Sequence, residues 1–135
     1  MSINLNNYKF YTTTVIAVLA MAILLSGIDL AHHALGQSKT SSVLIVKGAS
    51  NPTATEPYNP SSLSIPVGTT VTWTNSDNTE HTVTQGNPSG NTPQNGFDSG
   101  LLAPGKTFTH TFDTIGTIQY YCTLHPTMLG EVIVK

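Results

Sequence analysis

The only cysteine of the chain lies in a segment whose side chains could bind a metal ion. Cys122 is followed at three-residue steps by His125 and Met128, and Pro126 comes directly after the histidine. A thiolate, an imidazole and a thioether form a soft set of donors, which suits copper. We therefore expect the segment 122–128 to supply three ligands to one copper ion.

A second imidazole lies upstream, in His81 at the start of the strand-like run 81–85. Two histidines, one cysteine and a weak axial methionine are the ligands of blue-copper electron-transfer sites. His81, Cys122, His125 and Met128 are thus the predicted ligands of one type 1 copper ion. A trigonal set with a long methionine bond compromises between the geometries of Cu(I) and Cu(II), so little has to move when an electron arrives.

The same residues leave other interpretations open. A zinc ion could be held by His81, Cys122 and His125, although Met128 favours the softer metal. A copper carrier or storage protein without an electron-transfer role would need the same ligands, and the fold could also serve only as an interaction module. No nucleophile with a base and an orienting group can be assembled, and a binuclear copper centre would need a second loop cysteine. We expect a protein that is not an enzyme.

Length and charge narrow the class of partner. The chain of 135 residues is long enough for one ordinary domain. It has a net charge of −2 and contains no arginine, and its charged residues are scattered. Because a basic patch is absent, nucleic acid is not an expected partner.

The N-terminus reads as an export signal or an anchor. No charged residue lies between Lys9 and Asp29, and small residues at 34–36 could form a cleavage site, with Gln37 as the first mature residue. The uncharged stretch 10–28 is also close to the roughly 20 residues of a membrane-spanning helix, so a tether is the competing interpretation. Residues 1–36 are thus a predicted signal peptide or membrane anchor. In either case the domain 37–135 is expected to be exported, to the periplasm, the exterior or the outer face of the cytoplasmic membrane.

From residue 37 onward the sequence is typical of an all-β domain. Thr, Ser, Gly, Pro and Asn separate short β-branched runs. The expected strands are 43–47, 63–66, 69–75, 81–85, 97–102, 107–113, 117–122 and 131–135. Residues 51–62 and 86–96 are expected loops, and the sequence assigns no role to the second. Seven or eight short strands without a helix predict a β-sandwich of two sheets.

The two-residue period of a strand indicates which side chains face the core. Val71 and Trp73 share one face of their strand, and Tyr120 and Cys122 share one face of theirs, which points the thiol inward. The ligand loop then connects two core strands, which should hold the ligands in place with or without metal. His110 lies between two phenylalanines and is interpreted as a core or boundary residue.

Residues 62–135 resemble a cupredoxin, the family of small blue-copper proteins that includes plastocyanin, pseudoazurin and amicyanin. The resemblance rests on Val71-Thr72-Trp73-Thr74-Asn75, His81-Thr82-Val83, Pro104-Gly105-Lys106 and Tyr121-Cys122 with the ligand loop. The short gap between His125 and Met128 is similar to that of amicyanin, whereas plastocyanin has a longer loop.

This resemblance implies a Greek-key β-sandwich and one-electron transfer by Cu(II)/Cu(I) cycling, with His81, Cys122, His125 and Met128 as ligands. It also implies that His125 is the more exposed ligand, ringed by apolar residues where redox protein partners dock. Pro126 is a candidate for that ring, as is Leu129. We expect a monomer.

One position departs from the family pattern. Many cupredoxins carry an asparagine beside the upstream histidine, which braces the ligand loop, whereas Thr82 follows His81 here. We expect the Thr82 hydroxyl to supply a similar hydrogen bond. Glu80 precedes the histidine, and its charge is expected to stabilise Cu(II) and lower the reduction potential.

Overall fold

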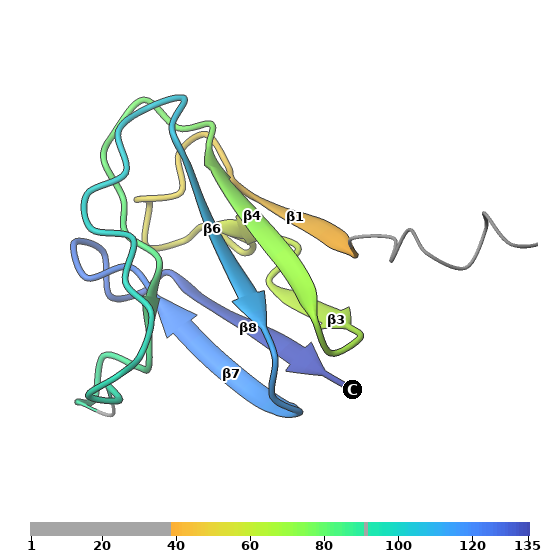
Figure 1. The fold of residues 1–135 in the computed structure, drawn as a ribbon. Coiled ribbons are helices and arrows are strands. Elements are labelled where there is room, and N and C mark those ends of the chain that lie inside the picture. Colours follow the sequence, from red (N-terminus) through yellow and green to blue (C-terminus); the bar gives the residue numbers. More distant parts are fainter. Residues whose placement is uncertain (1–38, 91) are drawn as a thin grey trace, which may run out of the picture. The chain divides into compact units, whose positions relative to one another are not determined.

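The computed structural model describes residues 39–90 and 92–135 (Figure 1). The predicted signal peptide or anchor, including the stretch 10–28, lies outside this part of the chain, as does the predicted boundary between residues 36 and 37. Those assignments stay predictions. Within the described ranges, no helix has the length and apolar character needed to cross a bilayer.

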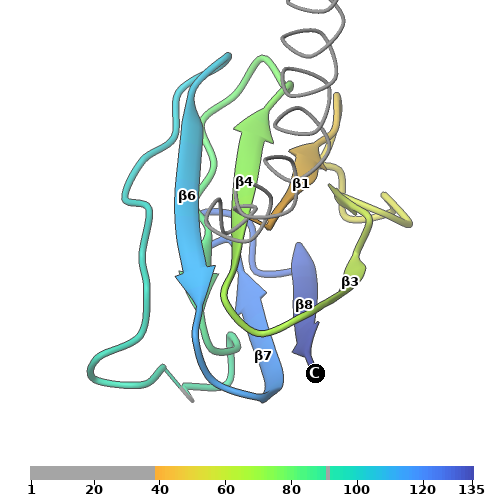
Figure 2. The ribbon, with the colours of Figure 1, turned by 45° about the vertical axis from the view of Figure 1, so that its right-hand side comes forward.

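In the described part of the chain, eight strands form two four-stranded sheets, which confirms the predicted β-sandwich. The strands are β1 (Thr40–Ile45), β2 (Tyr58–Asn59), β3 (Ser62–Ile65), β4 (Thr69–Asn75), β5 (Thr84–Gln85), β6 (Thr107–Phe112), β7 (Gly116–Tyr121) and β8 (Leu129–Val134). The first sheet has the order β2-β1-β4-β6 and the second the order β3-β8-β7-β5. Two pairs are parallel, β1 with β4 and β3 with β8. Figure 2 shows β1, β4 and β6 in one layer and β7 and β8 in the other.

Alternation along β4 builds the core between the sheets. Val71 and Trp73 are fully buried on its inner face, as their spacing predicts. The Trp73 ring meets the Tyr120 ring of β7 edge-on, with centroids 5.5 Å apart, so it bridges the two layers. The rings of Phe97, Phe108 and Phe112 surround the indole on its other sides. The strand that ends at the ligand loop is therefore fixed to the opposite sheet two residues before Cys122.

Three segments differ from the prediction. Of the expected strand 81–85, only Thr84–Gln85 is a strand, and His81 forms an isolated bridge. Residues 97–102 do not form a strand, and only isolated bridges join Asp98 to Thr84 and Leu102 to His81. Backbone hydrogen bonds still join this segment to residues 81–85, but the Val83 amide donates to the Ser99 hydroxyl at 2.8 Å instead of to a carbonyl, which interrupts the ladder. The predicted loop 51–62 contains β2, which pairs with the end of β1.

The loops that carry the ligands leave the same end of the sandwich. His81 lies between β4 and β5, and the segment 122–128 connects β7 to β8. Two backbone hydrogen bonds close that segment, from the Cys122 amide to the Met128 carbonyl at 3.2 Å and from the Met128 amide to the His125 carbonyl at 2.9 Å. Cys122 is completely buried, so the inward direction predicted for the thiol is confirmed.

Candidate metal centre

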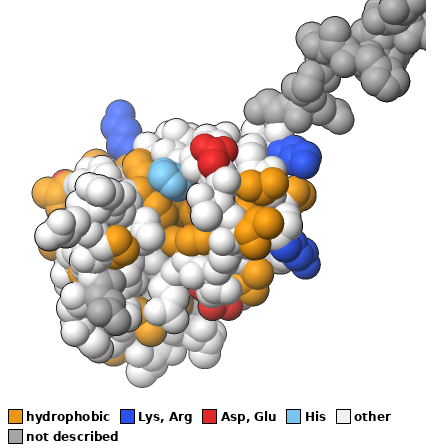
Figure 3. Space-filling model, turned by 60° about the horizontal axis from the view of Figure 1, so that its bottom comes forward, with side chains coloured by type: hydrophobic (Ala, Val, Ile, Leu, Met, Phe, Trp, Pro, Cys, Tyr) orange, Lys and Arg blue, Asp and Glu red, His pale blue; other side chains and the backbone are white. Residues whose placement is uncertain are grey.

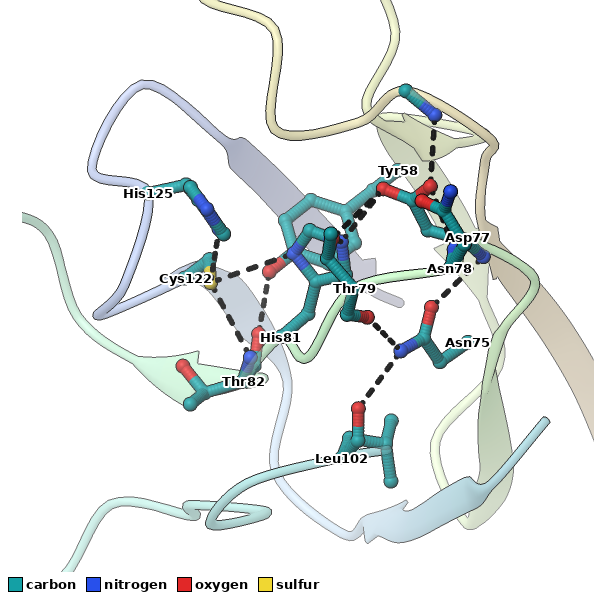
Figure 4. A network of polar contacts seen from close by, with 11 residues as sticks. Tyr58, Asn75, Asp77, Asn78, Thr79, His81, Thr82, Leu102, Cys122 and His125 are labelled. Atoms are coloured by element: carbon teal, nitrogen blue, oxygen red, sulfur yellow. Dashed lines mark hydrogen bonds and ion pairs between the residues drawn. The ribbon is translucent and has the colours of Figure 1, made fainter. Parts of the chain in front are cut away.

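Three predicted ligands converge at one end of the sandwich. The Cys122 sulfur lies 3.9 Å from Nδ1 of His81 and 3.7 Å from Nδ1 of His125. One donor atom from each of the three residues lies within 4.8 Å of the others. Figure 4 shows both imidazole rings turned toward the sulfur, although they come from two separate loops of the chain.

These distances fit one metal ion among the three donors. With bonds of about 2.0 Å to nitrogen and about 2.3 Å to sulfur, two ligands at a trigonal angle lie about 3.7 Å apart. The two sulfur–nitrogen distances match this value to within a few tenths of an ångström. The chain alone therefore positions a nitrogen, nitrogen and sulfur set close to its metal-binding geometry.

The thiolate has a hydrogen-bond donor from the backbone. The Thr82 amide nitrogen lies 3.3 Å from the Cys122 sulfur, and both residues are buried. A hydrogen bond to the charged form of an acid stabilises that form, so the amide favours the thiolate that a soft metal binds. Hydrogen bonds to a ligating sulfur also tune the electronic properties of a metal site.

The hydrogen bond expected between the Thr82 hydroxyl and the ligand loop is present. Its hydroxyl oxygen accepts the Thr123 amide at 2.9 Å and lies 3.2 Å from the Thr123 hydroxyl. The Thr84 hydroxyl donates to the same oxygen at 3.0 Å. A threonine therefore links the His81 loop to the first residue after Cys122, where many family members use an asparagine.

A buried carboxylate holds the His81 ring at Nε2, the nitrogen that does not face the Cys122 sulfur. Its Nε2 lies 3.0 Å from Oδ2 of Asp77, with both side chains at most 2% exposed. Burial alone would raise the pKa of the Asp77 carboxyl. Hydrogen bonds from the Gly48 amide, the His81 ring, the Asn78 amide and the Thr79 hydroxyl outweigh burial and bring this pKa well below its ordinary value. The carboxylate is therefore ionised at neutral pH.

Sequence reasoning missed Asp77 and Tyr58 as parts of the site. Tyr58 is completely buried, and its hydroxyl donates to the Thr82 carbonyl at 2.6 Å. Burial, with the charges of Cys122 and Tyr120 adding to it, raises the pKa of Tyr58 far above its ordinary value, so the phenol stays protonated as a donor. Glu80, whose charge was expected from the sequence to lower the reduction potential, is exposed.

The predicted ligands His125 and Met128 differ in exposure. Met128 is completely buried, whereas His125 is half-buried and is the more exposed of the two histidines. Exposed apolar side chains occur on the ligand loop and next to it: Leu124, Pro126 and Leu129. Leu101, adjacent to the residue that bridges to His81, is 62% exposed and was not anticipated.

Comparison with known proteins identifies the family. The family model of copper-binding proteins of the plastocyanin/azurin family matches residues 46–135. The chain belongs to this family. Its cofactor is therefore copper, and His81, Cys122 and His125 are placed to hold one ion of it.

Individual members of the family are similar to the chain over part of its length. The chloroplastic plastocyanin of Tetradesmus obliquus is 36% identical over 84 residues, which are 58% of each chain. Amicyanin-alpha of Methylorubrum extorquens is 35% identical over 53% of this chain and 58% of its own. The chain thus spans little more than half the length of these curated relatives. The structure of a purple cupredoxin from Nitrosopumilus maritimus superposes with a TM-score of 0.64, at 38% identity over 70% of this chain and 99% of that one.

Proposed function

We propose that this cupredoxin is a one-electron carrier with a type 1 copper site. His81, Cys122 and His125 would hold the ion, with Met128 as a fourth and weaker ligand. Copper, when bound, supplies the Cu(II)/Cu(I) couple. The observation that carries the proposal is the placement of two imidazoles at 3.7 and 3.9 Å from a buried sulfur that accepts a backbone hydrogen bond.

The surrounding residues suit electron transfer because they resist rearrangement. Cys122 follows the core strand β7, the Thr82 hydroxyl ties the two ligand loops together, and the Asp77 carboxylate holds the His81 ring. Ligands fixed in this way cannot follow the geometric preference of one oxidation state. Each transfer therefore needs little reorganisation of the protein.

The proposed partners are redox proteins that dock near His125. His125 is the most exposed of the three residues whose donor atoms converge, and Leu124, Pro126 and Leu129 offer exposed apolar contacts on the same loop and strand. On the face drawn in Figure 3, the basic side chains lie apart from one another, in keeping with a partner other than nucleic acid. We propose a monomer that performs no catalysis of its own.

The proposed location is outside the cytoplasmic membrane. The support is the sequence pattern of residues 1–36, which fits a cleaved signal or a tether through residues 10–28. Comparing the N-terminal residue of the protein recovered from its native cell with the encoded one decides between these two. A mature N-terminus near Gln37 supports cleavage, and an intact N-terminus in the membrane fraction supports the tether.

The function is tested by visible absorption of the Cu(II)-loaded protein and its Cys122→Ser variant. We expect an intense blue band in the wild type that bleaches reversibly on reduction and is lost in the variant. A full blue band in the variant would contradict the ligand assignment. A wild type that binds copper without such a band, and passes it quickly to a chelator, would favour the copper carrier or storage protein instead.

A further inference from the structure

We propose that Asp77 is a positioning residue of the copper centre, which fixes the tautomer of His81 and lowers the reduction potential through its buried charge. The inference rests on the proposed function and deepens it, because it names a group that lowers the reduction potential of the copper ion. It does not require a contact between Asp77 and the metal.

The first step concerns the ring proton of His81. A neutral imidazole carries one N–H, and an ionised carboxylate can only accept a hydrogen bond. Since Nε2 of His81 lies 3.0 Å from Oδ2 of Asp77, the proton belongs on Nε2. Nδ1, which lies 3.9 Å from the Cys122 sulfur, is left with a free lone pair directed at the metal position. A carboxylate on the second ring nitrogen is a recurrent way to orient a ligating histidine.

The second step is that the carboxylate is itself fixed. Oδ1 accepts the Gly48 amide at 3.0 Å and the Asn78 amide at 2.8 Å, and Oδ2 accepts the Thr79 hydroxyl at 3.2 Å together with the His81 ring. Gly48 follows β1, 29 residues before Asp77. The charge therefore has a single position, set by two separate segments of the chain.

The third step concerns the effect of this charge on copper. Asp77 is buried and lies one imidazole ring from the metal position, so water screens it little. A nearby negative charge stabilises Cu(II) more than Cu(I), because the oxidised ion carries one more positive charge. Glu80 is next to the ligand in sequence but is exposed, so its charge is screened and has a smaller effect.

The decisive variant is Asp77→Asn in the full chain. Asparagine keeps the size of the side chain and one oxygen for the Gly48 and Asn78 amides, but presents an NH₂ donor to Nε2 of His81. The ring proton then moves to Nδ1, where it opposes metal binding. The matched controls are Glu80→Gln, which removes an exposed charge, and Thr79→Val, which removes a hydroxyl that contacts both Nε2 and Oδ2 but leaves the carboxylate and its backbone hydrogen bonds.

The first readout is the tautomer of His81 in the metal-free protein, from ¹⁵N–¹H correlation spectra of the imidazole. We expect the Nε2–H form in the wild type and both controls, and the Nδ1–H form in Asp77→Asn. The second readout is the reduction potential of the copper-loaded proteins. In Asp77→Asn we expect the preference for Cu(I) over Cu(II) to rise by at least about tenfold, or about 59 mV for one electron, and by clearly less in the controls.

An Nδ1–H tautomer in the wild type would overturn the inference, and this measurement needs no variant to fold. So would an Asp77→Asn potential that changes no more than that of Glu80→Gln. These outcomes are separate from a failure of the proposed function. A wild type without the intense blue band would refute the type 1 site, whereas a normal blue protein with an unmoved potential in Asp77→Asn would refute only the role of Asp77.

Discussion

The backbone amide of Thr82 donates a hydrogen bond to the Cys122 sulfur at 3.3 Å, across 40 residues of sequence. The same threonine accepts the Thr123 amide through its hydroxyl and the Tyr58 phenol through its carbonyl, at 2.9 and 2.6 Å. One residue thus connects the histidine loop, the ligand loop and β2. Its amide acts on the sulfur and its other two groups hold that amide in place.

The Thr82→Val variant tests the bracing role. Valine keeps the shape and the backbone amide but removes the oxygen that accepts from Thr123 and Thr84. A buried donor without a partner costs about 1–3 kcal/mol, so we expect the free energy of unfolding of the metal-free protein to fall by that amount. The copper-loaded variant should keep its blue band. Denaturant titration measures the loss of stability, with Thr123→Val as the control that removes one hydroxyl partner of Thr82 but keeps the bond from the Thr123 amide. Equal midpoints for the two variants would contradict the bracing role.

The Met128→Leu variant tests the axial ligand. Leucine fills a similar volume in this fully buried position but offers no sulfur to Cu(II). We expect the blue band to remain, because it belongs to the thiolate, and the potential to rise by on the order of 59 mV, a tenfold gain in preference for Cu(I). Voltammetry of the copper-loaded protein provides the measurement. An unchanged potential would remove Met128 from the ligand set.

How much of the site could be read from sequence depends on how local the signal was. Cys122, His125 and Met128 lie within one short loop, and His81 begins a recognisable strand-like run, so residue types and spacing were sufficient to group them. Asp77 was missed because a carboxylate in a polar loop usually faces water, and its burial depends on the distant Gly48 amide. No local pattern reports such a contact.

Prediction of the strands from sequence was limited in the same way, to local patterns. The long alternating strands β4 and β6 were predicted almost to their ends, because their side chains alternate between core and surface. The two-residue strand β2 was not, since prolines flank it and a single buried tyrosine carries its packing. Residues 97–102 were predicted as a strand, but the Val83 amide bonds to the Ser99 hydroxyl, and this interrupts the backbone hydrogen bonds that join the segment to residues 81–85.

Gly130 is predicted to tolerate no side chain. It lies opposite Tyr120 in the β7–β8 ladder, and a Cβ atom there would overlap the tyrosine ring. Overpacking of this kind costs about 1–3 kcal/mol, so we expect Gly130→Ala to lower the free energy of unfolding accordingly. Leu129→Ala, at an exposed position on the same strand, is the control. A Gly130→Ala protein as stable as this control would show that Tyr120 has room to move aside.

His110 should make stability depend on pH in a defined direction. Its ring packs against Phe97 and Phe112 at centroid distances of 4.6 and 4.9 Å. Burial lowers its pKa below the ordinary value of 6.5, although the charge of Asp113 partly opposes the shift. The unfolded chain therefore takes up a proton at higher pH than the folded one, and stability is lost as the pH falls through 6.5 toward the folded pKa.

Below the folded pKa both states of His110 are protonated, and this loss levels off. The test compares urea midpoints of the metal-free wild type and His110→Gln between about pH 8 and about pH 5. Because both proteins share the ligand histidines, the difference between their pH profiles isolates the effect of His110. We expect the wild type to lose more stability over this range than the variant. Parallel profiles, or a steeper loss in His110→Gln, would show that the folded protein does not disfavour the charged form of this ring.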